Sequence, residues 1–258
     1  MAHPQYRQEW RPITPDRRRR WAFRPALAPT LAAALLLPVL LALADWQWHR
    51  AADKIALREH WAAQSALPPL RLSSTKLGAG DPFALAGRPV IVRGRWQAEH
   101  QVLLDNQVAD GQVGYRVFTP LRLPDGTAVL VDRGWVPAPP RRDEAPDVGL
   151  TTQDAVAAGV ASPAPVPGPF ARQDIDASLG SGILRVQLLD PPALSQRLGL
   201  DLAPWTLRLD PAAPDGYRRR WPPPGGLTPE RHRAYAVQWF ALAALLVIVY
   251  VKLNLRRI

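Results

Sequence analysis

The chain of 258 residues contains no cysteine. That absence excludes disulfide exchange, copper carriage by thiolates, iron–sulfur ligation and c-type haem attachment, because each of these needs a cysteine sulfur. Any folded domain in this chain must therefore be held by its packed core and by its connections, without covalent cross-links.

Familiar catalytic signatures are also missing. The sequence has no HExxH, no Gly-x-Ser-x-Gly, no phosphate-binding loop and no dinucleotide fingerprint. Acidic residues do cluster at Asp143-Glu144 and at 174–176, but both clusters lie in proline- or glycine-rich stretches, which favours solvated loops over a catalytic pair. The sequence therefore argues against an enzyme, and the alternative that remains is a membrane-tethered periplasmic hydrolase.

Two long apolar runs dominate what is present. Residues 26–44 are nineteen residues without a charge, enough to cross about 30 Å of hydrocarbon. A second span is assigned to 232–251. Its helix is expected to start earlier, because Thr228 can cap it and Pro229 suits the first helical position. Pro38 interrupts the first span and predicts a kink there.

Positive charge is concentrated outside these runs. Of the formal charge of +10, residues 1–25 carry +5 and residues 252–258 carry +3, which leaves only +2 for the 226 residues between them. Basic flanks beyond both spans follow the positive-inside rule. They predict a membrane protein with both termini cytoplasmic and with residues 45–231 on the far side. We expect the membrane to be a bacterial inner membrane, with residues 45–231 in the periplasm. The partner for this charge is membrane lipid, and no nucleic acid is expected.

A signal peptide is the competing interpretation of the N-terminal run, because Ala42-Leu43-Ala44 has the form of a signal-peptidase site. Cleavage there would leave one span. However, nineteen apolar residues exceed the usual 7–15 of a signal peptide, and the following residues 45–48 have the aromatic composition of a helix leaving a bilayer. Both spans are therefore expected to be retained.

The segment between the spans is expected to be rich in β-structure. The helix of the first span should continue over residues 45–65. Pro124-Asp125-Gly126 predicts a turn that joins two strands into a hairpin. The other expected elements are strands at 89–96, 101–105, 115–123, 127–136, 183–189 and 205–209, a helix at 192–198 ended by Gly199, and loops at 137–146 and 163–169. The fold class is thus an α+β membrane protein, with two transmembrane helices flanking a mostly antiparallel β extracytoplasmic domain.

Five short motifs occur in order along the chain. They are Trp46-Gln47-x-x-Arg50, Gly94-x-Trp96, Gly114-Tyr115-x-Val117-x-Thr119-Pro120-Leu121, the run Val129 to Pro137, and the stretch His232 to Trp239. Through them the chain resembles the Surfeit locus protein 1 family over most of residues 25–257. It departs from the family pattern at Asp45, where a small residue is common, and at Asp132, where asparagine is common.

This resemblance implies an assembly factor for haem-copper cytochrome c oxidase, which binds or positions haem a for insertion into subunit I. It implies His232 as the axial ligand candidate for the haem iron. Subunit I and the haem a synthase are the implied partners. The residues expected around the cofactor are His232, Tyr235, Gln238, Trp239, Trp46, Gln47 and Arg50. For Trp46, Gln47 and Arg50 the alternative is packing and hydrogen bonding between the two helix ends.

Alternatives to this assignment stay open. A membrane chaperone that stabilises nascent subunit I without binding haem fits the same motifs, and His232 could be only a polar group at a helix start. On a helical period, His232, Tyr235 or Ala236, Trp239 and Ala243 share one face, which suits either a flat cofactor or another membrane helix. His49 leaves the first span near the depth at which His232 enters the second, so a bis-histidine site also remains open.

The run Arg133-Gly134-Trp135 is expected to be structural. We predict that Gly134 allows close backbone approach, that Trp135 fills the β core, and that Arg133 pairs with an acid.

Overall fold

The computed structural model describes residues 21–74, 81–141, 143–167, 175–179, 182–221 and 226–257. The basic cluster Arg17–Arg20 and part of the loop expected at 163–169 lie outside these residues. The chain divides into two compact units, which we call the helix pair (Met1–Lys54 with Leu227–Ile258) and the β unit (Ile55–Gly226).

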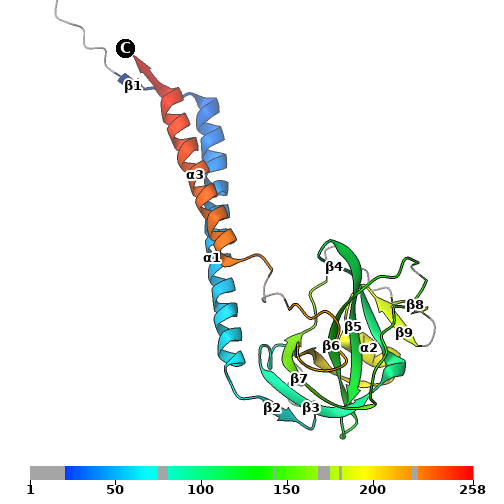
Figure 1. The fold of residues 1–258 in the computed structure, drawn as a ribbon. Coiled ribbons are helices and arrows are strands. Elements are labelled where there is room, and N and C mark those ends of the chain that lie inside the picture. The colour runs from blue at the N-terminus through cyan, green and yellow to red at the C-terminus, as the bar shows by residue number, and fades with distance from the viewer. Residues whose placement is uncertain are drawn as a thin grey trace, which may run out of the picture. The chain divides into compact units, whose positions relative to one another are not determined.

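The helix pair contains the two long apolar helices that the sequence predicts. Helix α1 (Leu27–Ser65) runs without interruption through Pro38 and through the expected extension to Ser65, and helix α3 (Pro229–Asn254) runs alongside its N-terminal part (Figure 1). In the most apolar window of each helix, 6% and 11% of the residues are buried. Helices of this length with outward-facing apolar side chains indicate a membrane protein, because a soluble core helix would be mostly buried.

The start of α3 agrees with the local signals. The Thr228 side chain accepts a hydrogen bond from the backbone N–H of Arg231 at 3.4 Å, and Pro229 takes the first helical position. At the opposite end, strand β11 (Leu255–Arg257) pairs with β1 (Trp21–Phe23) in a two-stranded antiparallel sheet, which the sequence analysis did not predict.

The β unit is one nine-stranded sheet in the order β2-β3-β7-β10-β6-β5-β4-β9-β8, with an additional pairing between β3 and β5. That pairing closes β3, β7, β10, β6 and β5 into a ring, so this part of the sheet is a small barrel. Most neighbouring strands are antiparallel, as expected, although β10–β6, β2–β3 and β4–β9 are parallel. The strands are β2 (Leu70–Leu72), β3 (Pro89–Trp96), β4 (Val102–Ala109), β5 (Gln112–Arg122), β6 (Thr127–Pro137), β7 (Asp154–Pro163), β8 (Ile175–Leu179), β9 (Ile183–Val186) and β10 (Asp201–Leu209).

Several local predictions are confirmed. Strand β3 has the expected bounds, and β5 and β6 form the expected hairpin, with Gly126 at φ +87° in its turn. Helix α2 (Pro191–Leu198) is capped by Asp190 and ends at Gly199, whose φ of +65° is left-handed. A short 3₁₀ turn, η1 (Ala98–His100), precedes β4. Strands β2, β7 and β8 were not predicted, and β8 includes Asp176, which was expected in a loop.

Two expectations about the Arg133-Gly134-Trp135 run are wrong. Trp135 is only half-buried, and it is Trp205 that fills the barrel core together with Trp96. Arg133 is buried and, within the described residues, its hydrogen bonds go to backbone carbonyls and neutral side chains; the Asp215 carboxylate attracts it but forms no hydrogen bond with it. The role of Gly134 is confirmed: at φ +110°, a Cβ there would lie 2.8 Å from the carbonyl oxygen of Arg218.

Candidate functional site

The helix pair is held by a face of small residues. Ala44 and Ala51 on α1 and Ala236 and Ala243 on α3 are buried, while many large apolar side chains of both helices remain exposed. Small side chains allow two membrane helices to approach closely. Of the two roles considered for the face below His232, contact with another membrane helix is therefore the one that the structure shows.

His232 lies at one end of this face, in the first turns of α3, and only 6% of it is exposed. Its Nδ1 is 2.7 Å from Oε1 of Gln47, which reaches across from α1. The two residues are separated by 185 positions in the sequence, so folding of the helix pair is what brings them together. The structure thus brings together two of the five motifs noted in the sequence.

This hydrogen bond sets the chemistry of the imidazole. Because an amide oxygen can only accept, Nδ1 carries the proton and donates it to Gln47. In the neutral form of the ring the lone pair is then on Nε2, and no hydrogen bond to Nε2 is found within the described residues. Histidines that bind metals commonly have their second ring nitrogen held by a neighbour in this way, which fixes the tautomer and the ring orientation.

Most of the other residues expected around a cofactor are exposed and are not buried with His232 and its partner. Trp46 is 57% exposed, Tyr235 and Gln238 are also exposed, and Trp239 is half-buried. Tyr235 therefore does not share the buried face, and Ala236 occupies that place instead. The exposed aromatic side chains lie in the middle of α1, at Trp46, and near the start of α3, at Tyr235.

The Arg50 side chain forms an ion pair within its own helix. Its guanidinium lies 3.6 Å from the carboxylate of Asp53, one turn further along α1, and the side chain is half exposed. An exposed pair of this kind contributes little stability, so Arg50 is free to exchange Asp53 for another anion at small cost.

His49 is in a different environment from His232. Its Nδ1 lies 3.0 Å from the carbonyl oxygen of Asp45 and 3.3 Å from the Asp45 carboxylate, and the His49 side chain is 71% exposed. Two positions on a helix correspond to about 200°, so His49 lies on the face of α1 opposite Gln47. Within the described part of the chain, no group of three histidine, aspartate or glutamate side chains comes together to hold a metal ion.

The opposite end of the helix pair is closed by polar contacts that the sequence analysis missed. Asn254 is fully buried, and its side-chain oxygen accepts from the backbone N–H of Ala26 at 2.7 Å. Thr30 and Tyr250 pair their hydroxyl groups at 3.1 Å. The available signal was a lone asparagine at the end of an apolar span, a position where an unpaired polar group is costly.

Comparison with known proteins supports the resemblance noted in the sequence. A model of the SURF1 family matches residues 34–244, which include both Gln47 and His232. The chain is also 31% identical over 113 residues to a SURF1-like protein from Dictyostelium discoideum, an alignment that covers 41% of this chain and 42% of that protein. The chain thus matches less than half the length of this relative.

Proposed function

The chain belongs to the SURF1 family, and on that premise we propose that it is a membrane assembly factor for a haem-copper cytochrome c oxidase. Family membership supports a role in oxidase assembly in general. The finer proposal is that the helix pair receives haem a as cargo and positions it for insertion into subunit I. In this proposal, His232 is the axial ligand of the haem iron.

The observation that supports this role is the hydrogen bond between His232 and Gln47. A histidine whose Nδ1 is held by an amide oxygen offers Nε2 as a metal ligand in a defined orientation. Trp46 and Tyr235 offer exposed aromatic surface for an apolar macrocycle, and the Arg50 guanidinium can pair with a propionate. Because His232 is nearly covered, haem binding requires the start of α3 to separate locally from the middle of α1 around Gln47.

The proposed location is the bacterial inner membrane. Both basic tails lie in the cytoplasm in this proposal, and residues 45–231 lie in the periplasm. The partners are subunit I of the oxidase and the haem a synthase. The exposed small residues Ala241 and Ala244 on α3 leave room for their helices beside the α1 contact.

A second candidate function is a membrane chaperone that stabilises nascent subunit I and binds no haem. The low exposure of His232 favours it, because a buried imidazole bonded to Gln47 can act simply as a polar connection between two helices. Hydrogen bonds of this kind in membranes contribute about 0.6–2 kcal/mol.

Haem content separates the two candidates. The full-length protein is purified in a neutral detergent from cells that make haem a, and haem per protein is measured by absorbance. Under the haem proposal the wild type carries haem, and His232→Ala loses most of it. Gln47→Ala weakens haem affinity by about 10- to 100-fold, because the ring loses its orienting partner. His49→Ala is the matched control and keeps its haem.

Under the chaperone candidate, the wild-type preparation is colourless although the cells contain haem a. Both His232→Ala and Gln47→Ala then lower the melting temperature of the helix pair and the oxidase yield together. Haem content that is unchanged in His232→Ala contradicts the ligand assignment and moves it to His49.

A further inference from the structure

A cavity of about 360 Å³ opens in the β unit beside the β4–β5 turn. Its volume is at the small end of the range of about 300–1,000 Å³ for small-ligand pockets. We call it the arginine–tryptophan cavity, because its wall includes Trp135, Trp221, Arg116, Arg218 and Arg220.

Backbone hydrogen bonds hold this wall in place. Trp135 of β6 donates to the carbonyl oxygen of Arg218 at 2.9 Å, and Arg218 donates back to Trp135 at 3.2 Å. Arg116 of β5 lies directly opposite Trp135 in the sheet register. The Trp221 indole is tied to β10 by a hydrogen bond from Nε1 to the carbonyl oxygen of Leu209 at 3.2 Å. The cavity is therefore preformed by the fold.

Arg116 contributes to the cavity a guanidinium group that is only partly hydrogen-bonded. Its Nη2 bonds Asp132, but its Nε is buried and has no hydrogen-bond partner among the described residues. Burial, and then repulsion from Arg208, lower the pKa of Arg116 to about 10. Among the described residues Arg208 itself forms no ion pair, and it lies over the Trp221 ring at 6.0 Å. Of these two neighbouring guanidinium groups, only that of Arg116 is paired with a carboxylate among the described residues.

At the rim of the cavity, two of the arginines already bind a carboxylate. The carboxylate of Asp110, in the β4–β5 turn, contacts Arg218 and lies 3.5 Å from Arg220. The Arg218 guanidinium also lies 5.7 Å from the Trp135 ring centroid, and that of Arg116 lies 5.4 Å from Trp221. Guanidinium groups stacked on indoles are held flat and keep their N–H edges available for a planar carboxylate.

We propose that the arginine–tryptophan cavity binds a carboxylate carried on an aromatic or apolar body. The three guanidinium groups take the carboxylate, and the two indoles pack against the body. The source is either a free organic acid or an acidic side chain next to an aromatic one on a partner polypeptide. This site lies wholly within the β unit, and its test does not involve haem.

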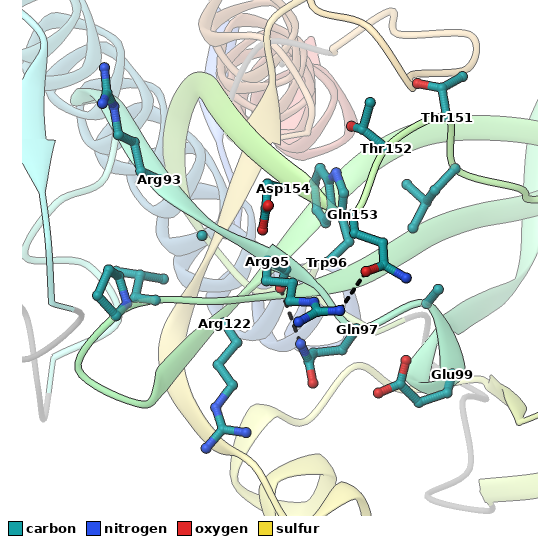
Figure 2. A pocket seen from close by; sticks show the side chains of 15 residues that line it. Arg93, Arg95, Trp96, Gln97, Glu99, Arg122, Thr151, Thr152, Gln153 and Asp154 are labelled. Atoms are coloured by element: carbon teal, nitrogen blue, oxygen red, sulfur yellow. Dashed lines mark hydrogen bonds between the residues drawn. The ribbon is translucent and has the colours of Figure 1, made fainter.

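A larger cavity, of about 800 Å³, lies where β3 and β5 close the barrel (Figure 2). Its arginines are exposed, and Arg95 is already bonded to the side chain of Gln153. No aromatic ring carries a stacked guanidinium there among the described residues. It makes a weaker case for a ligand, but it supplies Arg122, on the same strand as Arg116, as a matched control.

The test is a titration of the full-length protein in a neutral detergent, followed by ¹⁹F NMR. The free-acid probe is 4-fluorophenylacetate, with its uncharged amide as the comparison. The polypeptide probe is a blocked pentapeptide with 4-fluorophenylalanine between two glutamates, compared with its glutamine counterpart. Saturable binding of either charged probe, at least about tenfold tighter than its neutral analogue, is expected. The probe that binds more tightly identifies the source.

Variants then locate the binding. Arg116→Gln would leave Asp132 buried without its partner, so the test relies on residues at the rim. Arg218→Gln is expected to weaken binding about tenfold, and Asp110→Asn to tighten it about three- to tenfold, because Asp110 competes for the same arginines. Arg122→Gln leaves binding unchanged. Absence of saturable binding up to 10 mM of both charged probes, equal binding of the neutral analogues, or indifference to Arg218→Gln and Asp110→Asn would each overturn the proposal.

Discussion

Arg133→Met is expected to destabilise the β unit severely. Only 1% of Arg133 is exposed, and its guanidinium donates to several acceptors at once, some buried and some nearer the surface. Nε donates to the carbonyl oxygen of Asp215 at 2.6 Å and Nη2 to that of Gly149 at 2.6 Å. Nη1 donates to the carbonyl oxygen of Val148 at 3.0 Å and to Oε1 of Gln101 at 3.1 Å. One side chain of β6 thus forms hydrogen bonds to two separate loops, at 148–149 and at Asp215.

The expected magnitude follows from these bonds. Methionine keeps much of the apolar volume but removes the donor of the buried Val148 carbonyl group, at about 1–3 kcal/mol if it stays unsatisfied. The carbonyl groups of Asp215 and Gly149 are more exposed, and Gly149 also accepts from the Tyr217 hydroxyl, so their loss costs less. Part of this loss is offset, because the arginine no longer has to be desolvated; that desolvation is the largest cause that lowers the pKa of Arg133. The net loss should be about 2–4 kcal/mol, because several hydrogen bonds to a charged group are lost and only some of their acceptors can turn to water. In a unit of this size it lowers the melting temperature by about 4–16 °C.

Thermal unfolding of the full-length protein in detergent, followed by tryptophan fluorescence, measures this change. Arg122→Met is the matched control, since Arg122 is exposed on β5 and its replacement should change stability by less than about 0.5 kcal/mol. Proteolysis of Arg133→Met should also begin in the loops around Gly149 and Asp215. If the two variants melt within 2 °C of each other, roughly the effect of a 1 kcal/mol change, Arg133 does not hold these loops.

Three further predictions concern backbone approach and the helix pair. Gly134→Ala should destabilise the β unit by about 2–4 kcal/mol in the same melting assay, because its Cβ would lie 2.8 Å from the Arg218 carbonyl oxygen at a φ of +110°; a wild-type melting temperature would show that the 218–219 segment can move aside. Ala243→Leu should cost about 1–3 kcal/mol by overpacking the contact with α1, whereas Ala244→Leu, on the exposed face, should be neutral in the same detergent. A photocrosslinker at position 241 or 244 should capture subunit I or the haem a synthase, and capture of neither would contradict the proposed partners.

The helices could be predicted from the sequence because their causes are local. An uncharged run of nineteen residues predicts a span wherever it occurs, and Thr228 with Pro229 marks the start of α3 through contacts within one turn. The hairpin turn at Pro124-Asp125-Gly126 and the end of α2 at Gly199 are local in the same sense, since each needs only a residue with the right backbone freedom.

Strand β7 could not be predicted in this way. Its sequence, from Asp154 to Pro163, is rich in alanine and has no strong alternation of apolar and polar residues. It is a strand because β3 and β10 pair with it on both sides, so its conformation depends on segments far away in the chain. The same holds for Trp135 and Trp205: both read as strand tryptophans, and only the closure of the barrel decides that Trp205 lies inside.

The candidate site, like the fold, could be predicted from the sequence only in part. The sequence by itself determined that His232 and Gln47 each stand where an apolar helix meets a more polar segment, and family motifs singled out both. Only the tertiary structure decided that the two side chains bond across the helix pair, that His232 is buried, and that His49 faces away. The physical reason is that periodicity places a residue on a face of its own helix, while the partner of that face is set by packing between segments that are distant in sequence.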